Sequence, residues 1–264
     1  VTAVTYSRRR LHKVTYVTLI GRTLYGFYAW LVFTLCALFA LLATILVPSA
    51  PLRHRLTAAA SRGIFILGAV PAQVKGMQNL PPGSAVVVAN HASYADGMLL
   101  KGYLPYQYSF VIKGEMRNIP IAHFLLRRAG SKFVERHVQT GSSRDARLIV
   151  KAAQEGESLA FFPEGTFRKE PGIGRFRAGA FVAAIRGNMP VVPVAISGTR
   201  EMLPSGRPWP WPIRPRVVVL PPILPGDPEF EDHKQLAEAA RQRILAVLDE
   251  PDLCKVTDEN SNED

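Results

Sequence analysis

The sequence predicts an α/β protein with a mixed, largely parallel sheet flanked by helices, and with an apolar membrane helix or hairpin at its N-terminus. Short apolar runs typical of buried strands alternate with segments of helical periodicity over residues 85–248. Residues 24–47 form an apolar run of 24 residues without a formal charge. We therefore expect a membrane-anchoring segment over residues 1–72, an α/β domain over 73–250 and an acidic, disordered tail over 251–264.

The apolar run has the length of a membrane span, which needs about 20 apolar residues. Tyr25, Tyr28 and Trp30 gather at one end, as in an interfacial aromatic belt, and Pro48 and Pro51 end the helix at the other. The run is too long and starts too late for a cleaved signal peptide. A buried core helix is also disfavoured, because the run is apolar on all its faces.

Two modes of membrane insertion fit the apolar run, a true span and a shallow or hairpin insertion. Basic side chains flank it at both ends (Arg22 before it, Arg53 and Arg55 after it), so the positive-inside rule gives no single orientation. A second short apolar segment covers residues 63–70. A true span stays open, but these features favour shallow or hairpin insertion with both ends in the cytoplasm.

The strands and helices of the domain follow from local pattern and from start and stop signals. Pro120 lies in the first turn of one predicted helix and Gly130 ends it, while Ser142 and Asp145 form a weak capping signature for the next helix. Strands are predicted over residues 85–90, 109–113, 132–135, 158–162, 191–196 and 216–220, and helices over 96–104, 118–129, 142–155, 177–186 and 231–248. Residues 204–228 are rich in Pro and Trp and are expected to form a surface loop around one strand. Trp209 and Trp211 are expected to rest on the membrane.

Charge points to anionic partners. The chain has 32 Lys and Arg against 21 Asp and Glu, a net charge of +11, and seven of the acids lie in the last sixteen residues. Without that tail the net charge is +17, which favours nucleic acid, anionic lipid or phosphorylated substrates. The two cysteines, Cys36 and Cys254, exclude a disulfide framework and a zinc ligand set and favour a reducing compartment.

The first candidate site follows the predicted strand over 85–90. His91 and Asp96 are five residues apart, about 140° around an ideal helix, so they meet only if His91 lies in the turn before the helix and Asp96 in its first turn. Asp96 would then hold one ring nitrogen and leave the other free as a base. The alternative, a capping Asp beside an unrelated loop His, has about even odds on spacing alone.

The second candidate site follows the strand over 158–162, again where ligands gather at strand ends. It has one carboxylate, Glu164, beside Gly165 and Thr166. Four basic residues surround it, Arg168, Lys169, Arg175 and Arg177. Arg side chains and glycine-rich backbone suit phosphate oxygens, although a solvated basic loop is the alternative. Lys113 at a third strand end is a weaker candidate for another phosphate contact.

Together these blocks resemble the glycerolipid (lysophospholipid) acyltransferase family, which includes 1-acylglycerol-3-phosphate acyltransferases. The matching residues fall in four blocks: Asn90, His91, Ser93 and Asp96 for the family's His-x4-Asp motif; Lys113, Glu115, Pro120 and Gly130, with Arg136 downstream; Phe162 to Thr166 (FPEGT), then Phe176, Arg177 and Gly179; and Val192 to Ile196. One departure is Phe167, because phosphate-acceptor members commonly carry Arg directly after the Thr.

The resemblance implies a membrane-bound O-acyltransferase that moves an acyl chain from a thioester to a lysophospholipid hydroxyl, most simply 1-acylglycerol-3-phosphate, giving phosphatidic acid. Phe167 keeps a lysolipid without a phosphate monoester, such as a lyso-aminolipid, as the alternative acceptor. The resemblance implies no cofactor, with acyl-CoA or acyl carrier protein thioester as the donor, and no metal. We expect the active domain on the cytoplasmic face of the membrane, because both flanks of the apolar run are basic.

The resemblance also implies roles for single residues. His91 acts as general base and Asp96 orients it. The substrate-binding residues are Glu164, which binds glycerol hydroxyls or organises its loop, with Gly165, Thr166, Lys113, Arg168, Arg175 and Arg177. The apolar face with Ile121, Phe124 and Leu125 is expected to be core, or else to line an acyl groove.

Three rival functions fit less of the sequence. A serine hydrolase lacks a Gly-x-Ser-x-Gly elbow here, since Ser197-Gly198 has no such flanks. A nucleic-acid-binding protein would rest on the basic balance alone, without an RNA-binding strand or a recognition helix. A pure membrane scaffold explains the anchor and the charge but not the His/Asp and FPEGT blocks.

Overall fold

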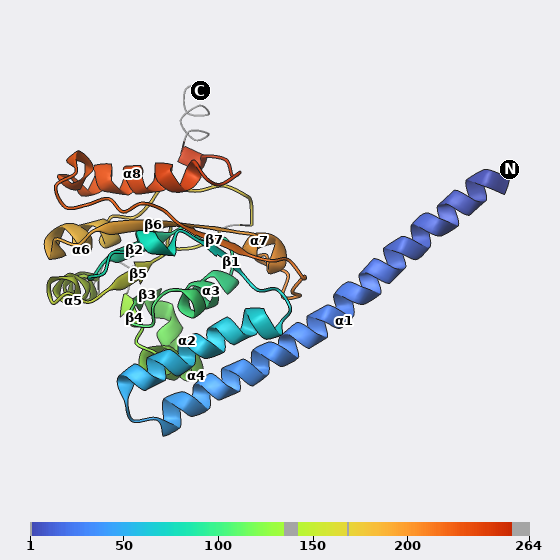
Figure 1. The fold of residues 1–264 in the computed structure, drawn as a ribbon, viewed down its shortest axis with the longest axis horizontal. Helices are drawn as coiled ribbons and strands as arrows, with labels where there is room; N and C mark the ends of the chain where they lie inside the picture. Colours follow the sequence, from blue (N-terminus) through green and yellow to red (C-terminus); the bar gives the residue numbers. More distant parts are fainter. Residues whose placement is uncertain (1, 135–141, 168, 255–264) are drawn as a thin grey trace.

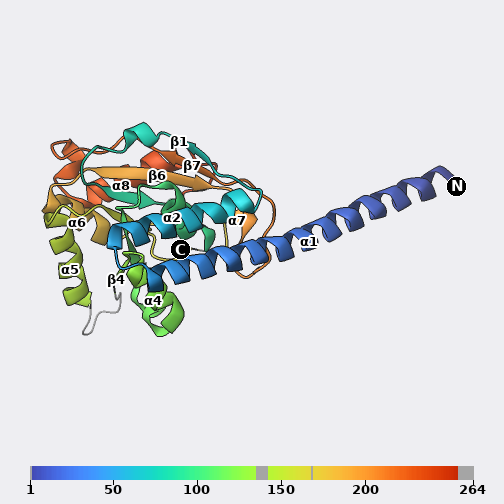
Figure 2. The same ribbon diagram turned by 60° about the horizontal axis from the view of Figure 1, so that its bottom comes forward.

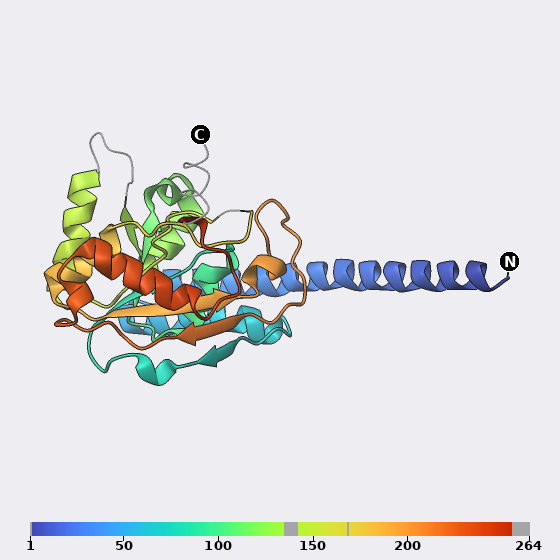
Figure 3. The same ribbon diagram turned by 90° about the horizontal axis from the view of Figure 1, so that it is seen from above.

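The structure, a computed structural model, describes residues 2–134, 142–167 and 169–254, without the side chains of residues 2–19 and 142–144. The chain begins with a helical hairpin. Helix α1 (Thr2–Leu46) runs in one direction and α2 (Ala50–Leu67) returns along it, with Pro51 in the first turn of α2. Figures 1–3 show the N-terminal part of α1 projecting beyond the rest of the molecule.

One segment of α1 meets the criteria for a membrane span by length and composition, residues 20–46. The prediction of an apolar N-terminal helix or hairpin is therefore confirmed as a hairpin of helices. The predicted second apolar segment is the last part of α2. Pro51 starts this helix instead of ending the first, as expected for proline in a first turn.

The rest of the chain forms a seven-stranded sheet in the order β1-β7-β6-β2-β5-β3-β4. Its strands are β1 (Gln73–Lys75), β2 (Val86–Ala89), β3 (Ser109–Lys113), β4 (Lys132–Val134), β5 (Leu159–Phe161), β6 (Val191–Ser197) and β7 (Arg216–Val219). Strands β6, β2, β5, β3 and β4 are mutually parallel, whereas β7 pairs antiparallel with β6, and β1 is parallel to β7. The sheet is thus mixed and largely parallel, as predicted.

Helices cover both faces of this sheet (Figure 1). On one face α5 (Ser142–Gln154), α6 (Gly179–Gly187) and α8 (His233–Leu245) enclose a core that includes Phe181, Ile223 and Leu236. On the other face α3 (Ala95–Tyr103) and α2 enclose a second core that includes Phe65 and Leu99. Because Phe65 is fully buried, α2 belongs to the packed body and not only to an anchor.

The remaining elements are short. They are the 3-10 turns η1 (Met77–Asn79), η2 (Gly114–Asn118) and η3 (Pro228–Phe230), and the helices α4 (Pro120–Arg128) and α7 (Thr199–Met202). Sequence patterns did not predict β1 or α7, since three or four residues carry no readable period. The expectation that Ile121 and Phe124 are core residues is wrong, because both are exposed and no residue of α4 is buried.

The predicted disordered tail starts too early at residue 251. Asp252 binds Arg241 through two hydrogen bonds of 2.6 and 3.1 Å, and Ile173 and Leu253 are joined through their backbones. Residues 251–254 are therefore packed against the domain, and residues 255–264 lie outside the described part of the chain.

Candidate active site

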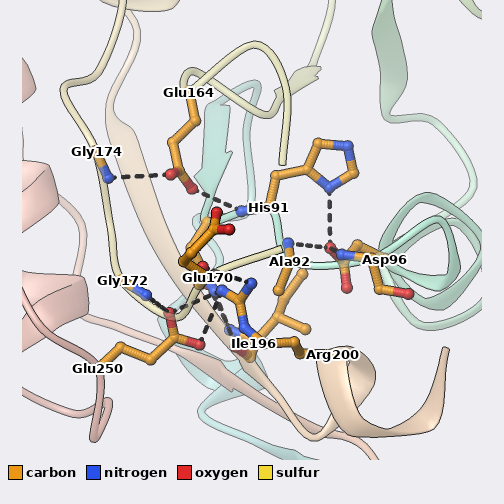
Figure 4. Close-up of polar contacts among 12 residues, drawn as sticks. His91, Ala92, Asp96, Glu164, Glu170, Gly172, Gly174, Ile196, Arg200 and Glu250 are labelled. Atoms are coloured by element: carbon orange, nitrogen blue, oxygen red, sulfur yellow. Dashed lines mark hydrogen bonds and ion pairs between the residues drawn. The ribbon is translucent and has the colours of Figure 1, made fainter. Parts of the chain in front are cut away.

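The centre of the candidate site is a His/Asp pair at the carboxyl end of β2 (Figure 4). His91 lies in the turn after β2 and Asp96 in the first turn of α3, as the spacing requires. Nδ1 of His91 is 2.9 Å from Oδ2 of Asp96. The same oxygen accepts hydrogen bonds from the backbone N–H groups of Ala92 at 2.7 Å and Ser93 at 2.8 Å. Asp96 is thus both a local turn residue and the partner of His91.

The imidazole of His91 is held between aromatic rings. It stacks on Phe162 with ring centroids 4.3 Å apart, and the Phe167 ring meets it edge-on at 4.7 Å. The His91 side chain is 18% exposed, whereas that of Asp96 is fully buried. With Nδ1 donating to Asp96, Nε2 is the acceptor nitrogen, and no hydrogen bond to it occurs within the described residues.

Asn90, the residue before His91, ties two neighbouring strands together. Its side-chain amide donates to the carbonyl of Ile196 at 2.9 Å and its carbonyl accepts from the N–H of Ile196 at 2.7 Å. This buried pair fixes the end of β2 against β6. We matched Asn90 to the family motif but did not predict this role, because its partner is 106 residues away.

Glu164 organises the loop after β5 instead of facing outward. One carboxylate oxygen accepts from the N–H of His91 at 2.8 Å and the other from the N–H of Gly174 at 3.1 Å (Figure 4). Burial raises the pKa of Glu164, and these two hydrogen bonds act in the opposite direction. Of the two roles expected for Glu164, the geometry favours loop organisation, since both oxygens already have backbone partners.

Two residues that the sequence analysis missed fasten the same loop from outside. Arg200 on α7 pairs with Glu250 at 3.0 Å, and Glu250 accepts from the N–H of Gly172 at 2.8 Å. Arg200 also donates to the carbonyl of Glu170 at 3.0 Å. Only the fold brings these segments together (Figure 4), and their sequence spacing carries no signal.

The structure unites some of the predicted binding residues and separates others. Gly165, with a φ of +83°, makes the left-handed turn at the start of the loop. Thr166, Arg175 and Arg177 are exposed on the loop that Glu164 anchors. Lys113, at the end of β3, forms an ion pair of 2.9 Å with Glu115. Arg168 and Arg136 lie outside the described residues. No group of three or more potential metal ligands occurs among the residues that were described.

An apolar pocket of about 490 Å³ lies near this site and has Tyr94 and Ala95 in its wall. Its walls come from α1, α2, the start of α3 and residues 202–210. The lining side chains are mostly apolar: Tyr25, Ala29, Trp30, Phe33, Ile64, Phe65, Val70, Tyr94, Ala95, Met98, Met202, Leu203, Arg207 and the prolines 204, 208 and 210. Its volume lies within the usual range for small-molecule sites, roughly 300–1,000 Å³.

The Trp-containing loop closes one side of this pocket by binding α1. The indole of Trp30 donates to the carbonyl of Pro208 at 2.9 Å, and that of Trp209 donates to the backbone carbonyl of Arg22 at 3.3 Å. Trp209 lies so close to Gly26 that a Cβ there would be 2.1 Å from its Nε1. Arg22 and Arg207 both stack on Trp211. Of the two indoles expected to rest on the membrane, that of Trp209 thus contacts α1 directly, and that of Trp211 contacts Arg22 of α1 and Arg207 of its own loop.

Comparisons with known proteins agree with this arrangement. A family model described as "Acyltransferase" matches residues 71–197. The chain is 31% identical over 135 residues to the chloroplastic 1-acyl-sn-glycerol-3-phosphate acyltransferase BAT2 of Brassica napus, covering 50% of this chain and 39% of the relative. It is 33% identical over 163 residues to the lyso-ornithine lipid O-acyltransferase of Pseudomonas aeruginosa, covering 60% and 59%. The chain thus spans less than two thirds of the length of each of these two relatives.

The fold itself also has a solved counterpart. The crystal structure of PlsC, the 1-acyl-sn-glycerophosphate acyltransferase of Thermotoga maritima, matches with a TM-score of 0.70 at 24% identity. The match covers 85% of this chain and 93% of that one. The fold of most of this chain is therefore a known architecture.

Proposed function

We propose that this chain, whose residues 71–197 match the acyltransferase family model, is a membrane-bound O-acyltransferase that moves an acyl chain from a thioester to the free hydroxyl of a lysophospholipid. One observation carries this proposal above the others. The imidazole of His91, fixed by Asp96, contacts the ring of Phe167, which also contacts Tyr94 in the wall of an apolar pocket. A proton acceptor beside an apolar pocket suits a reaction that joins a hydroxyl to a fatty acyl group.

In the proposed reaction Nε2 of His91 takes the proton of the acceptor hydroxyl while its oxygen attacks the thioester carbonyl. The tetrahedral intermediate collapses as the C–S bond breaks, and the imidazolium returns the proton to the leaving sulfur. The products are an ester and a free thiol, and His91 is neutral again. Asp96 orients the ring and stabilises its charged form. No acyl-enzyme is needed, since a thioester is already activated.

The acceptor that we favour is 1-acylglycerol-3-phosphate, which would give phosphatidic acid. Several relatives carry that name, including the Brassica enzyme. Arg175 and Arg177 are exposed on the loop that Glu164 holds beside His91, where their guanidinium groups suit phosphate oxygens. Arg168 and Lys113 remain candidate phosphate ligands from the sequence.

A second acceptor class has its own support. The relative from Pseudomonas aeruginosa is named for a lyso-ornithine lipid, which is a lyso-aminolipid. Phe167 occupies the position where phosphate-acceptor members commonly carry Arg, and its ring packs against His91 and Tyr94. An apolar side chain at this position would suit an acceptor without a phosphate monoester.

The donor and the location are also part of the proposal. The donor is acyl-CoA or acyl carrier protein thioester, both of which carry negative charge that the basic domain attracts. Helix α1 inserts into the membrane as part of the hairpin, and the α/β domain lies on the cytoplasmic face.

The direct test uses the full chain, purified in detergent micelles, with labelled acyl-CoA or acyl carrier protein thioester. Acceptors are offered singly: 1-acylglycerol-3-phosphate, lyso-ornithine lipid and a neutral lysolipid. We expect labelled phosphatidic acid, formed about 10²–10⁴-fold more slowly by the His91→Ala variant. Transfer only to lyso-ornithine lipid would establish the second acceptor class. Release of free fatty acid without any acceptor would instead indicate a hydrolase and overturn the proposal.

A further inference from the structure

Helix α4 presents an outer apolar face that the fold does not cover. Ile121 is 70% exposed and Phe124 is 42% exposed, and Ile119 at the helix start is 51% exposed. Elsewhere on the helix, the ring of His123 meets that of Phe133 in the edge strand β4 at 4.9 Å. An amphipathic helix with large apolar side chains facing outward is typical of a helix lying in a membrane interface.

This face continues the exposed apolar surface of the hairpin. The guanidinium of Arg128 donates to the carbonyl of Thr44 at 2.7 Å and lies 5.9 Å from the ring centre of Phe124. The end of α4 is thereby joined to the last turn of α1. Nearby residues of the hairpin are also exposed, Leu42, Ile45, Leu46 and Leu52. Figures 1 and 2 show α4 beside the turn from α1 into α2.

The border of this surface is basic. Helix α4 carries Arg127 and Arg128 and no acid, and no Asp or Glu precedes Asp96 in the chain. Cations beside apolar side chains match the charge of an anionic lipid surface.

We propose that α4 is a second membrane-inserting element, whose Ile121 and Phe124 enter the same leaflet as α1 while its arginines bind anionic headgroups. Contact with α1 favours lipid over a second protein copy, since the apolar face of α4 extends a surface that already needs an apolar environment. Two separate contact points would also fix the tilt of the domain on the membrane, which a single helix leaves free.

The test measures lipid contact and not acyl transfer, so a negative result would count against membrane insertion of α4 and not against the proposed function. In a full-length Cys36→Ala, Cys254→Ser background, Ile121→Cys and Phe124→Cys are each labelled with an environment-sensitive fluorophore. Val247→Cys is the matched control, because Val247 is 48% exposed but follows α8 on the other face of the sheet. The proteins are placed in vesicles of phosphatidylcholine and phosphatidylglycerol, with and without spin-labelled lipid.

We expect spin-labelled lipid to quench both α4 labels and to leave the Val247→Cys label unchanged. Equal exposure of all three labels to water in vesicles would overturn the proposal. A blue shift of the α4 labels in detergent that grows with protein concentration would also overturn it, because a second copy would then cover the face. Thermal melting of each labelled protein checks that the fold is retained.

Discussion

Oδ2 of Asp96 receives three hydrogen bonds, from Nδ1 of His91 and from two backbone N–H groups, while Oδ1 has no partner among the described residues. One oxygen of Asp96 thus makes the hydrogen bond that orients the imidazole, which Phe162 and Phe167 also contact. Substitution of Asp96 can therefore test the orientation of the His91 ring separately from the carboxylate charge, since an Asn can offer its carbonyl oxygen at the same place.

For the His/Asp pair we expect His91→Ala to lower the transfer rate by about 10²–10⁴-fold, the usual contribution of a positioned base. Asp96→Asn should lose less activity than Asp96→Ala, because it keeps the acceptor oxygen and removes only the charge. Initial rates with labelled thioester measure both effects. His233→Ala serves as control, because His233 also lies next to an Asp, at 3.3 Å, but at the exposed start of α8. Full activity in His91→Ala would exclude the proposed base.

For Glu164 we expect Glu164→Gln to loosen the loop over residues 163–178. An amide offers one carbonyl oxygen where the carboxylate accepts from two N–H groups, and an unpaired buried donor costs about 1–3 kcal/mol. Local opening should therefore become about tenfold or more frequent, measured by amide hydrogen exchange at Gly174 in the free protein. Glu170→Gln is the control on the same loop. Unchanged exchange together with a raised acceptor KM would instead show that Glu164 binds substrate.

For the pocket we expect Gly26→Ala to displace Trp209 from α1, since the added Cβ would lie 2.1 Å from its ring. The wall formed by residues 202–210 should then shift and the preferred acyl length should change. Competition between donors of different chain length measures this preference. Gly21→Ala is the matched control in the same helix, because nothing lies within 4 Å of a Cβ there. If both variants prefer the same acyl lengths, residues 202–210 do not determine acyl-chain selection.

For stability we expect Lys101→Met to raise the melting temperature at pH 7. Burial lowers the pKa of Lys101 from 10.5 to about 8, so the folded protein bears the cost of a poorly hydrated charge below pH 8. Between pH 8 and about 10.5 the unfolded state binds more protons than the folded state, and stability from this group rises with pH. The advantage of Lys101→Met should therefore shrink at pH 10. Lys151→Met, at an exposed position, should show no such trend.

Much of the site was readable from local spacing. Four residues separate His91 from Asp96, and a strand-to-helix turn is the local geometry that lets them meet. Spacing left a capping Asp beside an unrelated His as the alternative, and the family resemblance favoured the pair. The same holds for the loop after β5, where Gly165 marks the turn. The catalytic and binding roles of these residues stay predictions.

Other parts could not be predicted because their partners are far apart in the chain. The anchoring of the loop by Arg200 and Glu250 joins three segments that share no sequence pattern. The pocket likewise needs α1 and residues 202–210 together. The sequence analysis expected Ile121 and Phe124 to be core residues, but both are exposed. A helical period shows which residues share a face but not whether other elements cover that face.

The sequence by itself determined the alternation of strands and helices, the apolar length of α1, the basic balance and the His91–Asp96 turn, since each of these depends on neighbours within a few residues. The tertiary structure alone decided the strand order, the hairpin packing of α2, the closure of the apolar pocket by Trp209 on Gly26, and the open face of α4. These features depend on contacts between distant segments, which form only when burial of the two cores brings those segments together.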